Sequence, residues 1–284
     1  MNDYEKALEE AKNNPDVIGF ILVGSRGKGF ENEHSDHDAI MVVKDEATKA
    51  IHDKYEAQNL DNLDLNIRSL SDFKTFAAWE TPESWDRYNY AHVKILVDKT
   101  GGELEKIVHE KGHIPKDKLD KFIDWWIDGY VNGVYRSVKC IRNGNMFGAH
   151  LEAGNSMLDL LTLVFAVNGR HRPFLGYVEK ELKSYPLEHL PWSSDNFVAK
   201  MKKVLETADL ETQQELLSGI EKMSREILSQ VAESFEDQLL KHYVRTSSEF
   251  KNNIGTAKNI FQTKSAAKED YDLVTKEILG WMEI

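Results

Sequence analysis

Cysteine, positive charge and long apolar runs are all scarce in this chain of 284 residues, and each scarcity excludes a class of protein. Cys140 is the only cysteine, so neither an intramolecular disulfide nor a cysteine-rich zinc site is possible. No stretch reaches the ~18 apolar residues of a membrane span, and the N-terminus lacks the basic and then apolar pattern of a signal peptide. We therefore expect a cytoplasmic protein in a reducing compartment.

The charge balance is acidic, with 36 lysine and arginine residues against 48 aspartate and glutamate residues and a formal net charge of −12. A broad cationic footprint on a nucleic acid backbone is therefore not expected. An acidic site that binds divalent cations fits this balance, because bound Mg²⁺ supplies the positive charge that the side chains lack. Nucleic acid and membranes are accordingly not expected as partners, and the oligomeric state is left open.

Residues 1–112 combine short apolar runs, which are typical of buried strands, with helical patterns. The sequence thus predicts a mixed β-sheet with flanking helices. The expected strands cover residues 17–23, 38–43, 63–67 and 93–97, the expected helices cover residues 3–12, 45–58 and a segment opened by Ser71-Asp72-Phe73, and residues 24–35 are expected to form a polar loop.

Beyond Pro115 the apolar residues recur at helical spacing, and strand patterns disappear. Helices are expected from about residue 119, at residues 147–167 with Asn168-Gly169 as the C-cap, and at residues 211–243. The predicted fold class is therefore α+β. A first domain at residues 1–112 would be followed by an all-helical, substrate-binding domain at residues 113–284.

The most informative stretch joins Gly24-Ser25, directly after a buried strand, to Asp36-His37-Asp38 at the start of the next strand. A Gly-Ser turn lets the backbone approach a phosphate closely, and its N–H groups and hydroxyl can bind phosphate oxygens. Asp36 and Asp38 are two positions apart, so on an extended chain they face the same side and can hold hard cations. Asp64, which points away from the apolar face of the following strand, would complete the cluster.

These residues resemble the signature of the polymerase beta-like nucleotidyltransferase superfamily, in which an apolar strand, Gly-Ser and Asp-x-Asp follow one another at this spacing. Gly29, Ser35 and the strand with Asp64-x-Asn66 resemble positions of bacterial aminoglycoside and lincosamide nucleotidyltransferases. The segments from Tyr90 to Gly101 and from Phe165 to Pro173 resemble further parts of that group. One departure is His37, because the family usually has an apolar residue between the two aspartates.

The resemblance implies transfer of a nucleoside monophosphate, AMP in the first instance, from a nucleoside triphosphate to a hydroxyl group of a small molecule such as an antibiotic. Pyrophosphate would leave in a Mg²⁺-dependent reaction that uses two ions. Asp36, Asp38 and Asp64 would be metal ligands and catalytic residues. The residues expected to contact the triphosphate are Gly24, Ser25, Arg26 and Lys28, and Glu152 is a candidate base on the acceptor side.

Simpler interpretations remain beside this one. Arg26 and Lys28 could each be a solvated cation in a loop instead of a phosphate ligand. Glu152 could be an exposed glutamate on a helix. His34 and His37 beside two aspartates could indicate a transition metal, although paired carboxylates favour Mg²⁺. The chain could also be a catalytically silent nucleotide-binding or interaction protein of the same fold, or a nucleotidyltransferase that modifies proteins.

Overall fold

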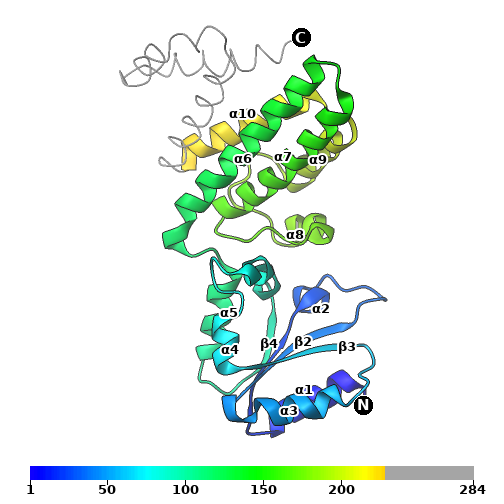
Figure 1. The fold of residues 1–284 in the computed structure, drawn as a ribbon, viewed down its shortest axis with the longest axis vertical. Helices are drawn as coiled ribbons and strands as arrows, with labels where there is room; N and C mark the ends of the chain where they lie inside the picture. Colours follow the sequence, from blue (N-terminus) through cyan, green and yellow to red (C-terminus); the bar gives the residue numbers. More distant parts are fainter. Residues whose placement is uncertain (228–284) are drawn as a thin grey trace. The chain divides into compact units, whose positions relative to one another are not determined.

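The computed structural model of the protein describes residues 1–227, and the contacts of the chain divide it into two compact units (Figure 1). The first unit comprises Met1–Pro115 and Gly169–Lys180, and the second comprises Lys116–Asn168 and the chain from Glu181 onward. The α+β class is confirmed. The segment 169–180 belongs to the first unit although the helices on both sides of it belong largely to the second.

The first unit is built on a four-stranded mixed sheet with the order β3-β2-β1-β4. All four strands were expected, three from apolar runs and β3 from alternating apolar and polar residues. Strand β1 is antiparallel to both of its neighbours, whereas β2 and β3 are parallel. The strands are β1 (Val17–Leu22), β2 (His37–Val43), β3 (Leu63–Ser69) and β4 (Lys94–Asp98).

Helices cover both faces of this sheet, and each face has its own buried core. Helices α1 (Asp3–Asn13) and α3 (Thr48–Glu56) pack on the face that carries Phe20, Ala39 and Met41 (Figure 1). Helices α4 (Leu70–Thr75) and α5 (Glu103–Gly112) pack on the opposite face, with Ile21, Ile40 and Val42. The short 3₁₀ helices η1 (Asp45–Ala47) and η2 (Pro82–Tyr90) complete the unit.

The segment after β1 differs from the expected polar loop, because Gly24–Lys28 forms a short helix, α2. Gly24 has a φ of +58°, which favours glycine, and this turn reverses the chain directly after the strand. Gly27 packs so closely that a Cβ there would lie 2.4 Å from the carbonyl oxygen of Leu22. A second small difference concerns α4, which was expected to open at Ser71 and instead begins at Leu70, with Ser69 as its N-cap.

The described part of the second unit is helical and contains none of the named strands. The pair α6 (Lys116–Arg142) and α7 (Met146–Val167) confirms the expected helical segments, and Gly169 follows α7 with a φ of +67°. None of the helices within residues 1–227 combines the length and apolar character needed to cross a membrane. The remaining described helices are α8 (Val178–Ser184), which spans the boundary of the units, α9 (Ser194–Thr207) and α10 (Leu210–Ile227). The short helix η3 (Leu175–Tyr177) belongs to the first unit. Residues 228–243 of the expected long helix lie outside the described residues.

Candidate active site

A pocket of about 290 Å³ lies in the first unit, on the face of the sheet that packs against α4 and α5. The strand ends of β1, β2 and β3 form its floor, and η2 and the segment 169–180 supply further walls. Three carboxylates line it, together with amide, guanidinium and aromatic side chains. The polar lining residues are Asp38, Asp64, Asn66, Arg68, Asp86 and Asn89, and the aromatic ones are Phe76, Tyr90, Phe174 and Tyr177.

Two of the predicted metal ligands, Asp38 and Asp64, are direct neighbours in the sheet. They are register partners in the parallel pair β2 and β3, so their backbones lie about 4.8 Å apart and their side chains share a face. Both line the pocket. The prediction that Asp64 points away from the Leu63 side of its strand is confirmed, because Leu63 packs in the core of the opposite face.

The third predicted ligand, Asp36, precedes β2 and is exposed. Its charge still reaches the pocket. Burial raises the pKa of the Asp38 carboxyl above its usual value, and the negative charges of Asp36 and Asp64 raise it further. The carboxylate of Asp38 therefore lies among negative charges at one end of the sheet.

Gly24 fits directly beneath Asp38. A Cβ at position 24 would lie 1.8 Å from Oδ2 of Asp38, so any side chain there would displace the carboxylate. Gly24 also lines the pocket, which places the start of α2 beside the paired aspartates. The Gly-Ser turn and the Asp-x-Asp strand are therefore parts of one packed arrangement.

Arg26 organises the loop that leads into β2. Its Nε and Nη2 donate hydrogen bonds to the carbonyl oxygen of Ser35 at 3.2 and 2.6 Å, and Nε also donates to that of Asp36 at 2.9 Å. Ser25 is 8% exposed. In this arrangement the Arg26 side chain holds the backbone around Asp36, which is a structural role beside the phosphate contact that the resemblance implies.

Lys28 has a structural role that the sequence did not indicate. Its side chain is 1% exposed, and Nζ donates hydrogen bonds to the carbonyl oxygens of Tyr88 at 3.0 Å, Asn89 at 3.2 Å and Ala91 at 2.5 Å. The ammonium group also lies 4.6 Å from the centre of the Tyr88 ring. Lys28 therefore joins α2 to the end of η2, and its contact with a triphosphate stays a prediction.

The unusual His37 faces away from the site. Its ring stacks on Tyr4 of α1, with the ring centres 4.1 Å apart and the planes at 21°. The histidine thus packs as a flat, largely apolar surface where the family has an apolar residue. Its position on the α1 side of β2 argues against a metal site shared with Asp36 and Asp38.

Sequence reasoning did not find the wall formed by η2 and the segment 169–180. Asn89 donates a hydrogen bond to Oδ1 of Asp86, and burial raises the pKa of the Asp86 carboxyl. Phe174 packs edge-on against Tyr88, with the ring centres 5.2 Å apart. A carboxylate within the aromatic run from Trp85 to Tyr90 was the available signal, but no spacing rule connects it with the strand carboxylates.

The segment 169–180 is fastened to the first unit at several points. The Ile114 amide donates to the Gly169 carbonyl at 3.0 Å, and Arg87 Nε donates to Nε2 of His171 at 3.2 Å. At its other end, Lys180 Nζ donates to the carbonyl oxygen of Phe30 at 2.7 Å. These contacts position Phe174 and Tyr177 on the pocket wall.

Glu152, the candidate base on the acceptor side, belongs to α7 in the second unit. One of its carboxylate oxygens lies 3.6 Å from Nη1 of Arg136. An ion pair of this kind is typical of a helix surface, and the acceptor-side role of Glu152 stays a prediction.

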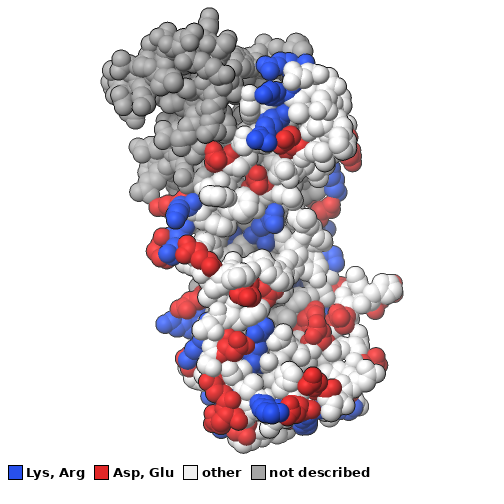
Figure 2. Space-filling view, in the orientation of Figure 1, with Lys and Arg blue, Asp and Glu red and all other residues white. Residues whose placement is uncertain are grey.

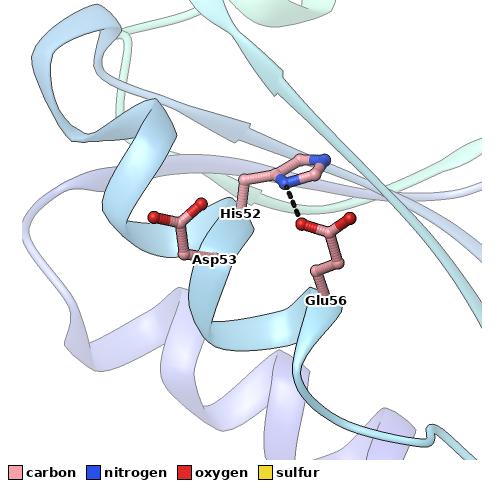
Figure 3. A group of neighbouring side chains, drawn as sticks. All are labelled: His52, Asp53 and Glu56. Atoms are coloured by element: carbon pink, nitrogen blue, oxygen red, sulfur yellow. Dashed lines mark ion pairs between the residues drawn. The ribbon is translucent and has the colours of Figure 1, made fainter.

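A different group of side chains has the closest set of potential metal ligands. Within residues 1–227, only His52, Asp53 and Glu56 bring three ligand atoms within 4.8 Å of one another (Figure 3). All three are exposed on α3, and His52 Nδ1 lies 3.6 Å from Oε2 of Glu56. The three predicted aspartates are more widely spaced than this, so the observed site is a close pair, Asp38 and Asp64, with Asp36 nearby.

Comparison with known proteins adds a likeness but no family. No family model and no curated protein matches the sequence. Among solved structures, the chain is similar to a nucleotidyltransferase-like protein from Exiguobacterium sibiricum, at 12% identity over 93% of this chain and 89% of that chain, with a TM-score of 0.39. Such values establish neither a common fold nor a common activity, so the function is inferred from the residues of the site.

Proposed function

We propose that the protein transfers a nucleoside monophosphate, AMP in the first instance, from a nucleoside triphosphate to a hydroxyl group of a small molecule. The pairing of Asp38 with Asp64, in a pocket that starts at the Gly24-Ser25 turn, carries this proposal. It places carboxylates for divalent cations next to a backbone turn suited to phosphate. The Gly-Ser turn and the aspartates of this site are the residues that carry the resemblance to the superfamily.

The residues present fit Mg²⁺. Carboxylate oxygens are its preferred protein ligands. Burial and, after it, the negative charges of Asp36 and Asp64 raise the pKa of Asp38, and a cation at this end of the sheet would neutralise that charge. Asp38 and Asp64 would be the first ligands, and Asp36 would complete a set able to share two ions. Bound Mg²⁺ would neutralise the triphosphate and lower the pKa of the attacking hydroxyl group.

The chain's own groups would do the remaining work. The first amides of α2 have no acceptor in a preceding helical turn, so those near Gly24 and Ser25 would donate hydrogen bonds to the departing phosphates. Asp64, exposed beside Asp38, would orient or deprotonate the acceptor hydroxyl. Arg26 would hold Asp36 at the strand end through its contacts with the preceding backbone.

The charge distribution supports a small acceptor. On the face drawn in Figure 2, the lysine and arginine side chains of the described residues lie in separate groups among aspartate and glutamate. The pocket volume of about 290 Å³ is at the lower end of small-molecule sites. An antibiotic of the aminoglycoside or lincosamide type is one acceptor that the sequence resemblance suggests.

The test is release of pyrophosphate from each of the common nucleoside triphosphates, with Mg²⁺ and a panel of hydroxylated small molecules. We expect release that requires both metal and acceptor, and a loss of about 100-fold or more in Asp38→Asn and Asp64→Asn. Asp53→Asn, in the exposed group on α3, is the matched control and should retain activity.

Three other outcomes would contradict the proposal in different ways. Nucleotide binding without release across the panel would favour a silent binding protein. Transfer of labelled nucleotide to a macromolecule would favour protein modification. Retained activity in Asp38→Asn would show that the paired aspartates are not the metal site.

A further inference from the structure

An aromatic surface continues outward from the wall of the pocket. Phe174 lines the pocket, and the ring of Trp85 in η2 lies beside it, with the ring centres 6.4 Å apart and the planes at 47°. Trp85 is 69% exposed. Single exposed apolar side chains are common on proteins, but this one adjoins the candidate active site. We call Trp85 and Phe174 the aromatic shelf.

Buried contacts hold the two rings of the shelf together. Phe174 packs edge-on against Tyr88, whose side chain is buried in η2 close to Trp85. Arg87, which is also buried, donates from Nε to Nε2 of His171 at 3.2 Å. This hydrogen bond joins η2 to the segment that carries Phe174. The shelf is therefore in place before a ligand binds, which lowers the entropic cost of binding.

A ligand can reach both rings. Most of the Trp85 side chain is open to solvent, and Phe174 is half-buried on the surface of the pocket. Indole and phenyl rings attract other flat rings by stacking, and a stacked nucleic acid base is a common partner of such surfaces. The shelf is therefore suited to a flat ring that extends from the pocket towards solvent.

The nucleoside triphosphate is the substrate of the proposed reaction that always carries a flat aromatic ring. Its phosphates are expected at Gly24 and Ser25, where the strand ends form the floor of the pocket. Its base must lie apart from them, because the ribose separates the base from the phosphates. The shelf meets this requirement, since Phe174 belongs to a different wall of the pocket and Trp85 lies beyond the lining.

We propose that the aromatic shelf binds the base of the nucleoside triphosphate by stacking, beside the pocket in which the phosphates react. This inference deepens the proposed function and rests on it. Stacking uses the faces of the base and not its hydrogen-bonding edges, so the shelf accepts every base. A purine has the larger ring system, and the shelf therefore favours purine over pyrimidine nucleotides.

The test compares ATP with tripolyphosphate, which has the phosphates but no base, by calorimetric titration of the full chain with Mg²⁺ and without an acceptor. Trp85→Ala should weaken ATP binding about fivefold or more, as expected for the loss of stacking on one base, and should leave tripolyphosphate binding unchanged. Trp85→Phe keeps a flat ring and should retain most of the affinity. The wild type should bind ATP more tightly than UTP, and Trp85→Ala should reduce this difference.

Trp125 provides the matched control, because it is 75% exposed and belongs to α6 in the second unit. Trp125→Ala should bind ATP and tripolyphosphate as the wild type does. Both alanine variants should unfold at nearly the same denaturant midpoint as the wild type, since substitutions of exposed side chains change stability little.

Several results would overturn the aromatic shelf. They are normal ATP binding by Trp85→Ala, an equal loss of tripolyphosphate binding in that variant, a lowered midpoint that shows Trp85 to be needed for packing, and an equal loss of ATP binding in Trp125→Ala.

Failure of both ATP and tripolyphosphate to bind the wild type would instead count against the proposed transfer reaction. Adenosine alone, followed by ligand-observed NMR, then tests the shelf without phosphates. It should bind to the wild type and to Trp125→Ala and lose this binding in Trp85→Ala, and its failure to bind to the wild type would overturn the shelf as well.

Discussion

The carboxylate of Asp38 occupies the space that a side chain at Gly24 would need, with only 1.8 Å between Oδ2 and the position of a Cβ. The two residues are separated in sequence by a helix and a loop. A side chain at position 24 would nevertheless force the Asp38 carboxylate or the turn itself to move. This contact gives a physical reason for the joint occurrence of a Gly-Ser turn and an Asp-x-Asp strand. It also makes the glycine a direct test of the site.

Gly24→Ala should abolish Mg²⁺-dependent pyrophosphate release, with a loss of about 100-fold or more if Asp38 is a metal ligand. The added methyl group would displace the carboxylate and would also strain a backbone with a φ of +58°. Gly29→Ala is the control, because Gly29 has a φ of +73° and no atom within 4 Å of its Cβ position. It should show the strain alone, about 1–2 kcal/mol of unfolding free energy, and keep most of the activity. Equal activity losses in the two variants would contradict a specific role for the Gly24 contact.

Asp64→Asn should lower the pKa of Asp38, because it removes one of the two negative charges that raise it. A carboxyl pKa raised in the folded state gives stability that is fully present below the unfolded value of 3.8 and is lost as the pH rises through the folded pKa. Without Mg²⁺, the variant should therefore be more stable than the wild type near pH 7, by a few tenths of a kcal/mol after screening by solvent. Carboxyl ¹³C titration and urea unfolding at pH 4 and pH 7 would measure both effects. An unchanged Asp38 titration would show that the two carboxylates do not interact.

Lys28→Met should destabilise the protein by about 2–4 kcal/mol, because three carbonyl oxygens lose their donor in a buried place. Lys94→Met is the matched control. Lys94 is exposed and donates to one carbonyl oxygen, that of Arg26 at 2.9 Å, so its loss should cost less than about 1 kcal/mol. Urea unfolding distinguishes a structural role of Lys28 from a role in binding the triphosphate. A variant of normal stability with a raised KM for the triphosphate would restore Lys28 as a phosphate ligand.

His171 should make the protein less stable in mild acid. Burial, together with the neighbouring Arg87 cation, lowers its pKa from 6.5 to about 4. Because Nε2 accepts the hydrogen bond from Arg87, the folded protein needs the neutral ring. The neutral His171 ring therefore contributes to the stability of the folded protein above pH 6.5. This contribution, about 2 kcal/mol after allowance for the incomplete burial of the ring, is lost as the pH falls towards 4.

The measurement is urea unfolding at several pH values between 7 and 4, in the wild type and in His171→Gln. Glutamine can still accept from Arg87 but does not titrate, so the variant should have a flatter profile over this range. His34→Gln, at an exposed histidine, should behave like the wild type. A profile of His171→Gln as steep as that of the wild type would mean that His171 protonates freely in the folded state.

Much of the first unit could be predicted because its signals are local. Apolar runs identified three of the strands. The alternation of Leu63, Asp64 and Leu65 identified β3 and the side of the sheet on which Asp64 lies. The direct pairing of Asp64 with Asp38 could not be read in the same way. It depends on a parallel register between β2 and β3, which is set by packing of the helix between them.

The misses share one physical cause, which is contact between residues far apart in sequence. Lys28 resembles a solvated loop cation until its three acceptors, contributed by residues 88–91, are known. The same holds for Phe174 and Tyr177, which line a pocket of the first unit although they follow a helix of the second. The expected polar loop became helical at Gly24–Lys28 because glycines allowed close packing on β1 and β2.

The helices α6 and α7 leave the first unit after Pro115 and the chain returns to it at Gly169, and the two crossing points are neighbours. Ile114 and Gly169 share a backbone hydrogen bond of 3.0 Å, and His113 and Arg170 form an antiparallel bridge. A helical hairpin whose ends meet in this way can lengthen, shorten or be exchanged during evolution while its attachment stays closed. The inserted hairpin can therefore diversify without any change to the residues that line the pocket of the first unit.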